Sequence, residues 1–135
     1  MRLTQTEGEF ALSLELYAVG QDLLAVLQGG RAHLGCAVLA VPRPSLADPE
    51  QIGCTSSVLN RVGHKDEVLC RRFAEELCVH TGRATVCTGG LHWDHLSEQQ
   101  FHRVSQAAEQ LLRQALSQCP KREKGGETAE NFLRG

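Results

Sequence analysis

Four short segments hold most of the side chains that could bind a ligand or move a proton. They are rich in Gly, His, hydroxyl and charged residues: 29–35 (GGRAHLG), 55–57 (TSS), 63–66 (GHKD) and 89–95 (GGLHWDH). Imidazole, carboxylate and hydroxyl groups can exchange protons or form hydrogen bonds, and a lysine can hold an anion. Sequences of this kind are typical of turns, where binding residues concentrate. We therefore expect function to reside in these four segments.

The segment 63–66 is the most informative, because it lies between a predicted strand and a predicted helix. The free backbone N–H groups and the dipole of a helix amino end favour an anion, and Lys65 would add a full positive charge. The hydroxyls of Thr55, Ser56 and Ser57 on the preceding strand could donate to phosphate oxygens. The alternative is structural: Asp66 or His64 caps the helix while Lys65 faces solvent.

The segment 89–95 invites a metal interpretation, since His and Asp are ordinary zinc ligands. On an extended chain His92 and Asp94 point the same way, and His33 or His64 could join them in space. A metal-dependent enzyme would use His33, His92, Asp94 and His95. No HExxH or CxxC spacing supports such a site. The alternative is a hydrogen-bonded turn in which Asp94 orients a histidine and Trp93 anchors the loop by burial.

Catalytic signatures are missing from the sequence. Ser56 or Ser57 with His64 and Asp66 would supply the residue types of a triad, but there is no GxSxG elbow. The thiols lie among apolar residues, where burial lowers reactivity. The GxGxxG and P-loop motifs are also absent. We therefore predict a binding role without catalytic machinery of its own, and keep a small metal-dependent enzyme as an alternative.

Alternating hydrophobicity predicts the strands that must position these segments. In 10–19 every second side chain is apolar, as in a half-buried strand. The turn at 20–22 and the Gly pair at 29–30 are short connections, which predict an antiparallel meander. The predicted strands are 10–19, 23–27, 33–41, 52–59 and 84–88.

Two helices follow from a change of period to about four residues. The first begins near Asp66, carries an apolar stripe that includes Phe73, and ends at Gly82. The second begins with Ser97 and Gln100, which form a capping box. Pro120 stops it. Its predicted buried stripe is Phe101, Val104, Ala108, Leu111, Ala115 and Leu116.

These elements predict an α+β domain over residues 1–120, with a mainly antiparallel sheet of about five to six strands and two helices packed on one face. The charged residues 121–135 are predicted to be a mobile tail. The other face of the sheet needs solvent or a second copy of the chain, so we also expect a homodimer.

Composition excludes several classes of function. A net charge of −2 and an aromatic content of 4% argue against nucleic-acid binding. The longest apolar stretch, 34–41, is far too short to span a membrane, and the first residues do not resemble a signal peptide. The six cysteines contain no CxxC pair and are expected to stay reduced, which predicts a cytoplasmic protein.

Several of these motifs together resemble one family. They are GGxxHxG at 29–35, the strand TSSVLN at 55–60, GHKD at 63–66 and GxHxD at 90–94. The chain thereby resembles the prenylated-flavin chaperones typified by the small D subunit of gallate decarboxylase, over about residues 9–118. The loop 43–53 and the cysteine-rich first helix have no counterpart in this resemblance.

The resemblance implies an accessory protein that handles prenylated FMN or FMN for a UbiD-type decarboxylase. It also implies a fold similar to that of the proteasome-assembly chaperones, which often dimerise. A second alternative function is therefore a protein-assembly chaperone that binds no small ligand. The expected cofactor site consists of His33, His64, Lys65, Asp66, His92 and Asp94, together with Gly35 and the hydroxyls of Thr55, Ser56 and Ser57.

Overall fold

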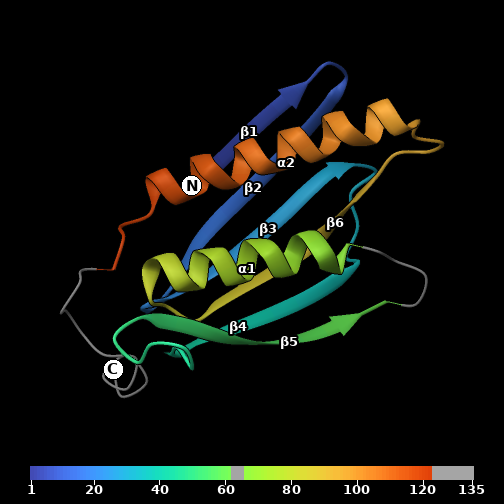
Figure 1. The fold of residues 1–135 in the computed structure, drawn as a ribbon. Coiled ribbons are helices and arrows are strands. Elements are labelled where there is room, and N and C mark those ends of the chain that lie inside the picture. The colour runs from blue at the N-terminus through green and yellow to red at the C-terminus, as the bar shows by residue number, and fades with distance from the viewer. Residues whose placement is uncertain (62–65, 123–135) are drawn as a thin grey trace.

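The computed structural model describes residues 1–61 and 66–122, and confirms the α+β class. A single sheet carries two helices on one of its faces (Figure 1). The strands are β1 (Arg2–Glu7), β2 (Phe10–Val19), β3 (Asp22–Gly30), β4 (Cys36–Pro44), β5 (Ile52–Asn60) and β6 (Thr85–His92), and the helices are α1 (Glu67–Thr81) and α2 (Glu98–Gln118).

The sheet has six strands in the order β1-β2-β3-β6-β4-β5. The β1–β2 and β2–β3 pairs are antiparallel, as are β4–β5 and β4–β6. The β3–β6 pair is parallel. The expected meander therefore holds from β1 to β3 but not from β3 to β4, because β6 lies between them. The connection 31–35 crosses the end of β6 instead of making a tight turn.

The core lies between the sheet and the helix layer. α2 covers β1 and β2, whereas α1 covers β4, β5 and β6 (Figure 1). Alternate residues along each central strand face the helices, so that Leu14 pairs with Leu27 and Val38 with Cys87, all four fully or almost fully buried. Burial of such side chains is the main force that holds the helices on the sheet.

Local sequence determines the helix ends. Ser97 and Gln100 form the predicted capping box, with Gln100 N–H donating to Ser97 Oγ at 3.1 Å and Ser97 N–H donating to Gln100 Oε1 at 2.9 Å. Gly82 ends α1 in the left-handed conformation (φ 69°), as predicted. Phe101 was expected in the buried stripe of α2, but it is 62% exposed: it lies in the first turn of the helix, before the buried stripe, which begins at Val104.

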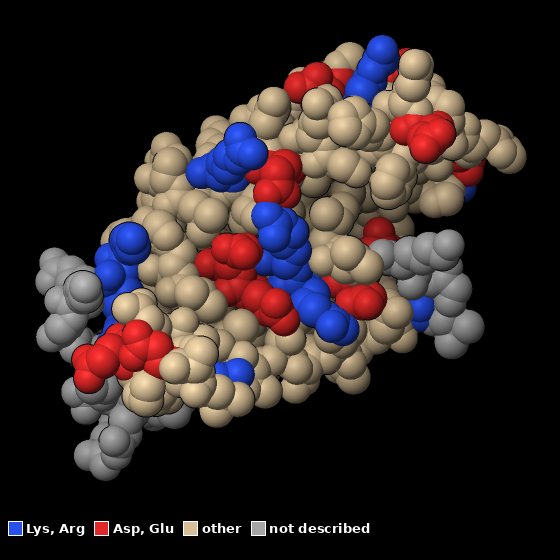
Figure 2. Space-filling model, viewed as in Figure 1, with Lys and Arg blue, Asp and Glu red and all other residues tan. Residues whose placement is uncertain are grey.

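The outer surface of the helix layer is charged. Figure 2 shows basic and acidic side chains interleaved over it. Arg72 of α1 and Glu109 of α2 form a two-pronged ion pair that joins the helices, with Arg72 Nε donating to Glu109 Oε2 at 3.1 Å. This surface is therefore a solvated one with mixed charges.

The opposite face of the sheet carries no helix. One register row across it runs Tyr17, Leu24, Val86, Leu39 and Ser57, from β2 to β5. Leu39 is 43% exposed, so apolar surface remains open. Among the described residues, no helix is both long enough and apolar enough to cross a membrane.

Candidate functional site

The polar segments converge at one end of the sheet. β3 and β6 run parallel and end there, β4 begins there, and α1 and α2 start from the same end (Figure 1). This topology brings the bend after β3, the start of α1 and the segment after β6 together. His33, Asp66 and His92 come from these three places, although 59 residues separate the first from the last.

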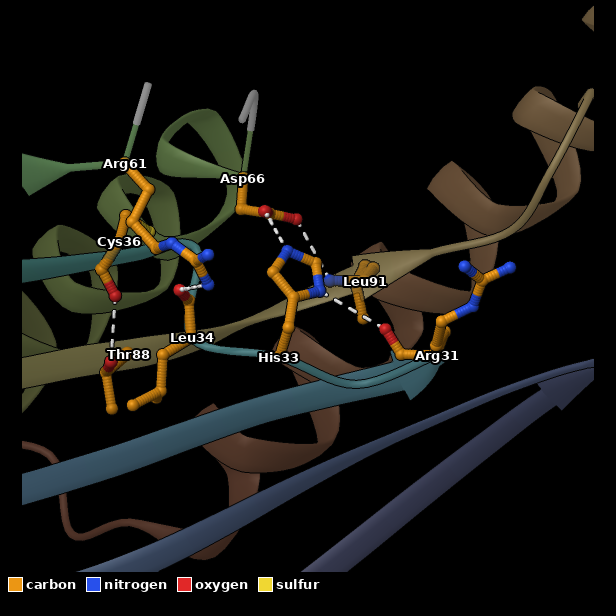
Figure 3. Close-up of polar contacts among 8 residues, drawn as sticks. All are labelled: Arg31, His33, Leu34, Cys36, Arg61, Asp66, Thr88 and Leu91. Atoms are coloured by element: carbon orange, nitrogen blue, oxygen red, sulfur yellow. Dashed lines mark hydrogen bonds and ion pairs between the residues drawn. The ribbon is translucent and has the colours of Figure 1, made fainter. Parts of the chain in front are cut away.

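The centre of this end is an ion pair between His33 and Asp66. His33 Nε2 lies 2.8 Å from Asp66 Oδ2, and the two side chains are only 19% and 11% exposed (Figure 3). The second oxygen, Asp66 Oδ1, accepts a hydrogen bond from the backbone N–H of Leu91 at 2.9 Å. One carboxylate therefore connects the start of α1 to β6 and to the bend after β3.

Asp66 does not cap its helix with its side chain. It occupies the N-cap position, but its backbone is helical (φ −68°, ψ −17°) and its carboxylate makes no capping hydrogen bond. The structural alternative for Asp66 is therefore wrong. Its carboxylate is turned towards His33 and Leu91 instead, which is an arrangement that holds the site together rather than the helix end.

The His33 ring lies between two acceptors. Its Nδ1 lies 3.2 Å from the Arg31 carbonyl oxygen, and its Nε2 faces the Asp66 carboxylate. A neutral imidazole carries one N–H and can donate to only one of them, whereas an imidazolium donates to both. The His33 ring is therefore oriented by a polar contact on each of its two nitrogens.

Two glycines make room for this pair. A Cβ on Gly35 would lie 2.1 Å from Asp66 Oδ2, and a Cβ on Gly90 would lie 2.7 Å from His33 Nε2. Both distances are far below van der Waals contact, so any side chain at either position would displace the His33–Asp66 pair. The glycines of the GGxxHxG and GxHxD motifs therefore have a steric purpose here.

A second, exposed cluster adjoins the first. His92 Nε2 lies 2.9 Å from Asp94 Oδ1, and Arg31 donates to Asp94 Oδ2 at 2.6 Å. The His92 hydrogen bond and the Arg31 charge lower the pKa of Asp94 below its usual 3.8. The rings of His33 and His92 are 6.5 Å apart, centre to centre, and meet edge to face.

The segment 92–95 is also the hydrogen-bonded turn considered above, since Asp94 orients His92. Trp93 packs edge to face on the buried ring of Phe10, with centroids 5.3 Å apart. Gly29 and Gly30 permit this approach, because a Cβ on either would come within 2.8 Å of the indole. Among the described residues, no group of three or more His, Cys, Asp and Glu side chains could hold a metal ion.

The three hydroxyl residues of β5 lie apart from this cluster. Thr55 Oγ1 accepts from Arg43 Nε at 2.8 Å, and Ser56 donates to Glu75 of α1 at 2.7 Å. Ser57 is exposed opposite Leu39 on the open face of the sheet. Within the described ranges, no hydrogen bond joins these hydroxyls to His33, whereas Gly35 lies against Asp66. His64 and Lys65 lie outside the described residues.

The thiols beside the site are poorly suited to nucleophilic chemistry. Cys36, Cys70 and Cys87 are buried and unpaired, where β4, α1 and β6 pack together. Burial raises the pKa of the Cys36 thiol well above its usual value. The pKa of the Cys70 thiol is also raised, mainly by its contact with Cys87. A thiol that stays protonated at neutral pH is a weak nucleophile.

Sequence reasoning left Arg31 and Gly90 out of the predicted site. Arg31 lies two residues before His33 in the same bend and reaches Asp94 across the gap between the segments. Gly90 lies against His33. Arg31 lies in the motif 29–35 and Gly90 in the motif 90–94, so the motifs could have pointed to both residues. They were missed because glycine has no functional group and because a surface arginine is usually an ordinary solvated charge.

A family model matches most of the chain. Residues 6–120 match the prenylated flavin chaperone LpdD-like domain, which covers β2 to β6, both helices and all three segments of the site. A search of curated proteins found no match. Because the family match spans most of the sequence, the chain belongs to the family of prenylated flavin chaperones with an LpdD-like domain.

Proposed function

We propose that this protein binds prenylated FMN, or FMN itself, and delivers or protects it for a UbiD-type decarboxylase. Family membership over residues 6–120 is the observation that carries the proposal. The His33–Asp66 pair and the neighbouring His92 and Arg31 supply the hydrogen-bond donors that would hold the cofactor.

The described residues fit such a ligand. A phosphorylated flavin combines an anionic phosphate with a planar ring that both donates and accepts hydrogen bonds. The end of the sheet offers a guanidinium and two imidazoles beside the amino end of α1, where the helix dipole favours an anion. Gly35 and Gly90 leave no room for a side chain beside His33 and Asp66, so the positions of these two groups are closely restricted.

Titration with FMN and with prenylated FMN tests the proposal. We expect saturable binding to the wild-type protein, followed by flavin fluorescence or calorimetry. His33→Ala and Asp66→Asn each remove a charged hydrogen bond, so we expect affinity to fall about ten-fold or more. His102→Ala, an exposed histidine of α2, is the matched control and should bind like the wild type.

Two results would contradict the proposal. One is the absence of saturable binding of either flavin to folded wild-type protein. The other is equal affinity of wild type and His33→Ala. Because His33 is only 19% exposed, circular dichroism must show that His33→Ala is folded, and His92→Gln at the half-exposed neighbour serves as a second variant.

The remaining parts of the proposal concern partners and compartment. A cofactor chaperone needs an enzyme to receive its cargo, and a UbiD-type decarboxylase is the partner we propose. We also propose that a second copy of the chain covers the β4–β5 part of the open face of the sheet, where Leu39 and Leu59 are 43% and 78% exposed. Six free cysteines fit a reducing compartment such as the cytoplasm.

A further inference from the structure

A hollow of about 350 Å³ lies on the helix-free face of the sheet, at the same end as the His33–Asp66 pair. The first three strands and the start of the following bend form it. Its polar lining consists of Arg2 and Thr4 of β1, Ser13 of β2 and Gln28 of β3. The volume falls within the range of small-molecule binding sites.

Three of these side chains form one row across the strands. Thr4 pairs with Ser13, and Ser13 pairs with Gln28, so all three project from the same face. In the described ranges 1–61 and 66–122, none of the three side chains makes a hydrogen bond. Two hydroxyls and a carboxamide are therefore available side by side.

Ser13 is the unusual member of the row. It is only 8% exposed although no helix covers its face, and its hydroxyl lines the hollow without a protein partner. A hydroxyl at the wall of a hollow can donate to and accept from a bound group. The Ser13 hydroxyl, which makes no hydrogen bond among the described residues, is therefore open to a group that enters the hollow.

The row continues into the His33–Asp66 pair. The next register neighbour of Gln28 is Gly90 of β6, and the space of its missing side chain is taken by His33, whose Nε2 would lie 2.7 Å from a Cβ there. Ala32, which lines the hollow, directly precedes His33. The hollow and the ion pair are therefore adjacent parts of one surface.

The polar lining of the hollow is largely uncharged. Arg2 is its one charged lining residue, and its guanidinium lies 3.7 Å from the Glu15 carboxylate, which offsets the positive charge. The other polar side chains of the lining, Thr4, Ser13 and Gln28, are neutral groups that both donate and accept, and the rest of the lining is apolar or glycine. Such a lining suits the uncharged, hydrogen-bonding part of a ligand.

We propose that Ser13 and Gln28 hold the pyrimidine-like edge of a flavin ring in this hollow, while the phosphate lies on the other side of His33. This inference rests on the proposed function and makes it specific, because it assigns recognition of the ring to residues outside the motifs 29–35, 63–66 and 90–94. Thr4 supports the same edge from β1.

Ring-only flavin provides the test. Lumiflavin has the ring system but no phosphate, so a site that recognises the ring binds it measurably. We expect Ser13→Ala and Gln28→Leu each to weaken both lumiflavin and FMN by about five- to ten-fold, the loss of one hydrogen bond. The matched controls Ser105→Ala and Gln110→Leu, on the exposed surface of α2, bind like the wild type.

An independent readout locates the ligand. In ¹⁵N-labelled protein, the side-chain NH₂ resonances of Gln28 should shift when lumiflavin is added, whereas those of Gln110 should stay in place. Two results overturn the assignment of the hollow and leave the proposed function standing. One is that the Gln28 resonances do not change. The other is that Ser13→Ala and Gln28→Leu bind both flavins like the wild type while His33→Ala loses FMN. Failure of wild-type protein to bind any flavin overturns both.

Discussion

At the scale of single residues, the site depends on one carboxylate that serves three elements. Asp66 starts α1, accepts from the backbone of β6 at Leu91 and pairs with His33 from the bend after β3. Removing either side chain of this largely shielded pair leaves the polar group of the other without that hydrogen-bond partner, which costs free energy. The pair is therefore more important for the geometry of the site than an exposed pair such as Arg31–Asp94.

Replacing Gly35 by alanine tests this dependence. A Cβ there would lie 2.1 Å from Asp66 Oδ2 and 2.9 Å from its Cγ, so the carboxylate must move and lose at least one partner. We expect a loss of about 1–3 kcal/mol in the free energy of unfolding, measured by urea denaturation.

Gly53→Ala is the control for this substitution. Its nearest neighbour is the end of the flexible Arg43 side chain at 3.1 Å, which can give way. Gly53→Ala should therefore leave stability almost unchanged. Equal stability of Gly35→Ala and wild type would show that Asp66 is not held as tightly as the structure indicates.

The sequence was informative about the residues at this end but not about their contacts. His33, Asp66, His92 and Asp94 were singled out by type and by their position in turns. Their pairing follows from the parallel alignment of β3 and β6, which depends on contacts between distant parts of the chain. Residues with no chemical signature, such as Ser13 in the hollow, could not be found from their type at all.

At the scale of elements, local signals were reliable where they acted alone. The alternation in β2, the capping box of α2 and the left-handed Gly82 were all predicted correctly. β1 was missed, because RLTQTE has a single buried apolar residue, Leu3, and gains its strand structure by pairing with β2. Gly29 and Gly30 were assigned to a turn but continue β3 beside β6, where their lack of side chains admits Trp93.

The buried Cys78 thiol of α1 makes the free energy of unfolding depend on pH in the alkaline range. Burial raises the pKa of Cys78 from 9.0 to about 12, so its thiol ionises in the unfolded chain well before it does in the folded one. The stabilising effect is complete below pH 9 and is lost progressively between pH 9 and pH 12. At pH 10 Cys78 alone accounts for a loss of about 1.4 kcal/mol.

Urea denaturation at pH 8 and pH 10 measures this effect. Cys78→Ala should show a decrease in unfolding free energy between the two values that is smaller than the wild-type decrease by about 1.4 kcal/mol. The comparison of slopes is independent of any general destabilisation by the substitution. Parallel pH dependence of the two proteins would contradict the assignment.

At the scale of the whole molecule, the two faces of the sheet differ in kind. One is covered by helices with a mixed-charge outer surface (Figure 2). The other exposes apolar side chains on β4 and β5, with the hollow towards β1. An open apolar patch of this kind is typical of a surface that associates with another protein.

If the chain forms the proposed homodimer, lysine substitutions in the apolar patch should lower the mass of the particle in solution. Leu39→Lys and Leu59→Lys place charges on the open face and should convert a dimer to a monomer in sedimentation experiments, because unpaired buried charges oppose association. Val79→Lys, which places the same charge on exposed α1, should leave the mass unchanged. A wild-type protein that sediments as a monomer at all concentrations would exclude the dimer.

The position of β6 between β3 and β4 has a consequence for synthesis on the ribosome. β6 is the last strand of the nascent chain to emerge, yet it fills the middle of the sheet. Until β6 has emerged, no strand joins the β1–β2–β3 meander to the β4–β5 hairpin. Each of them then presents an unpaired strand edge of the kind that promotes aggregation. The two halves of the candidate site, His33 and His92, therefore come together only when translation has passed the final strand.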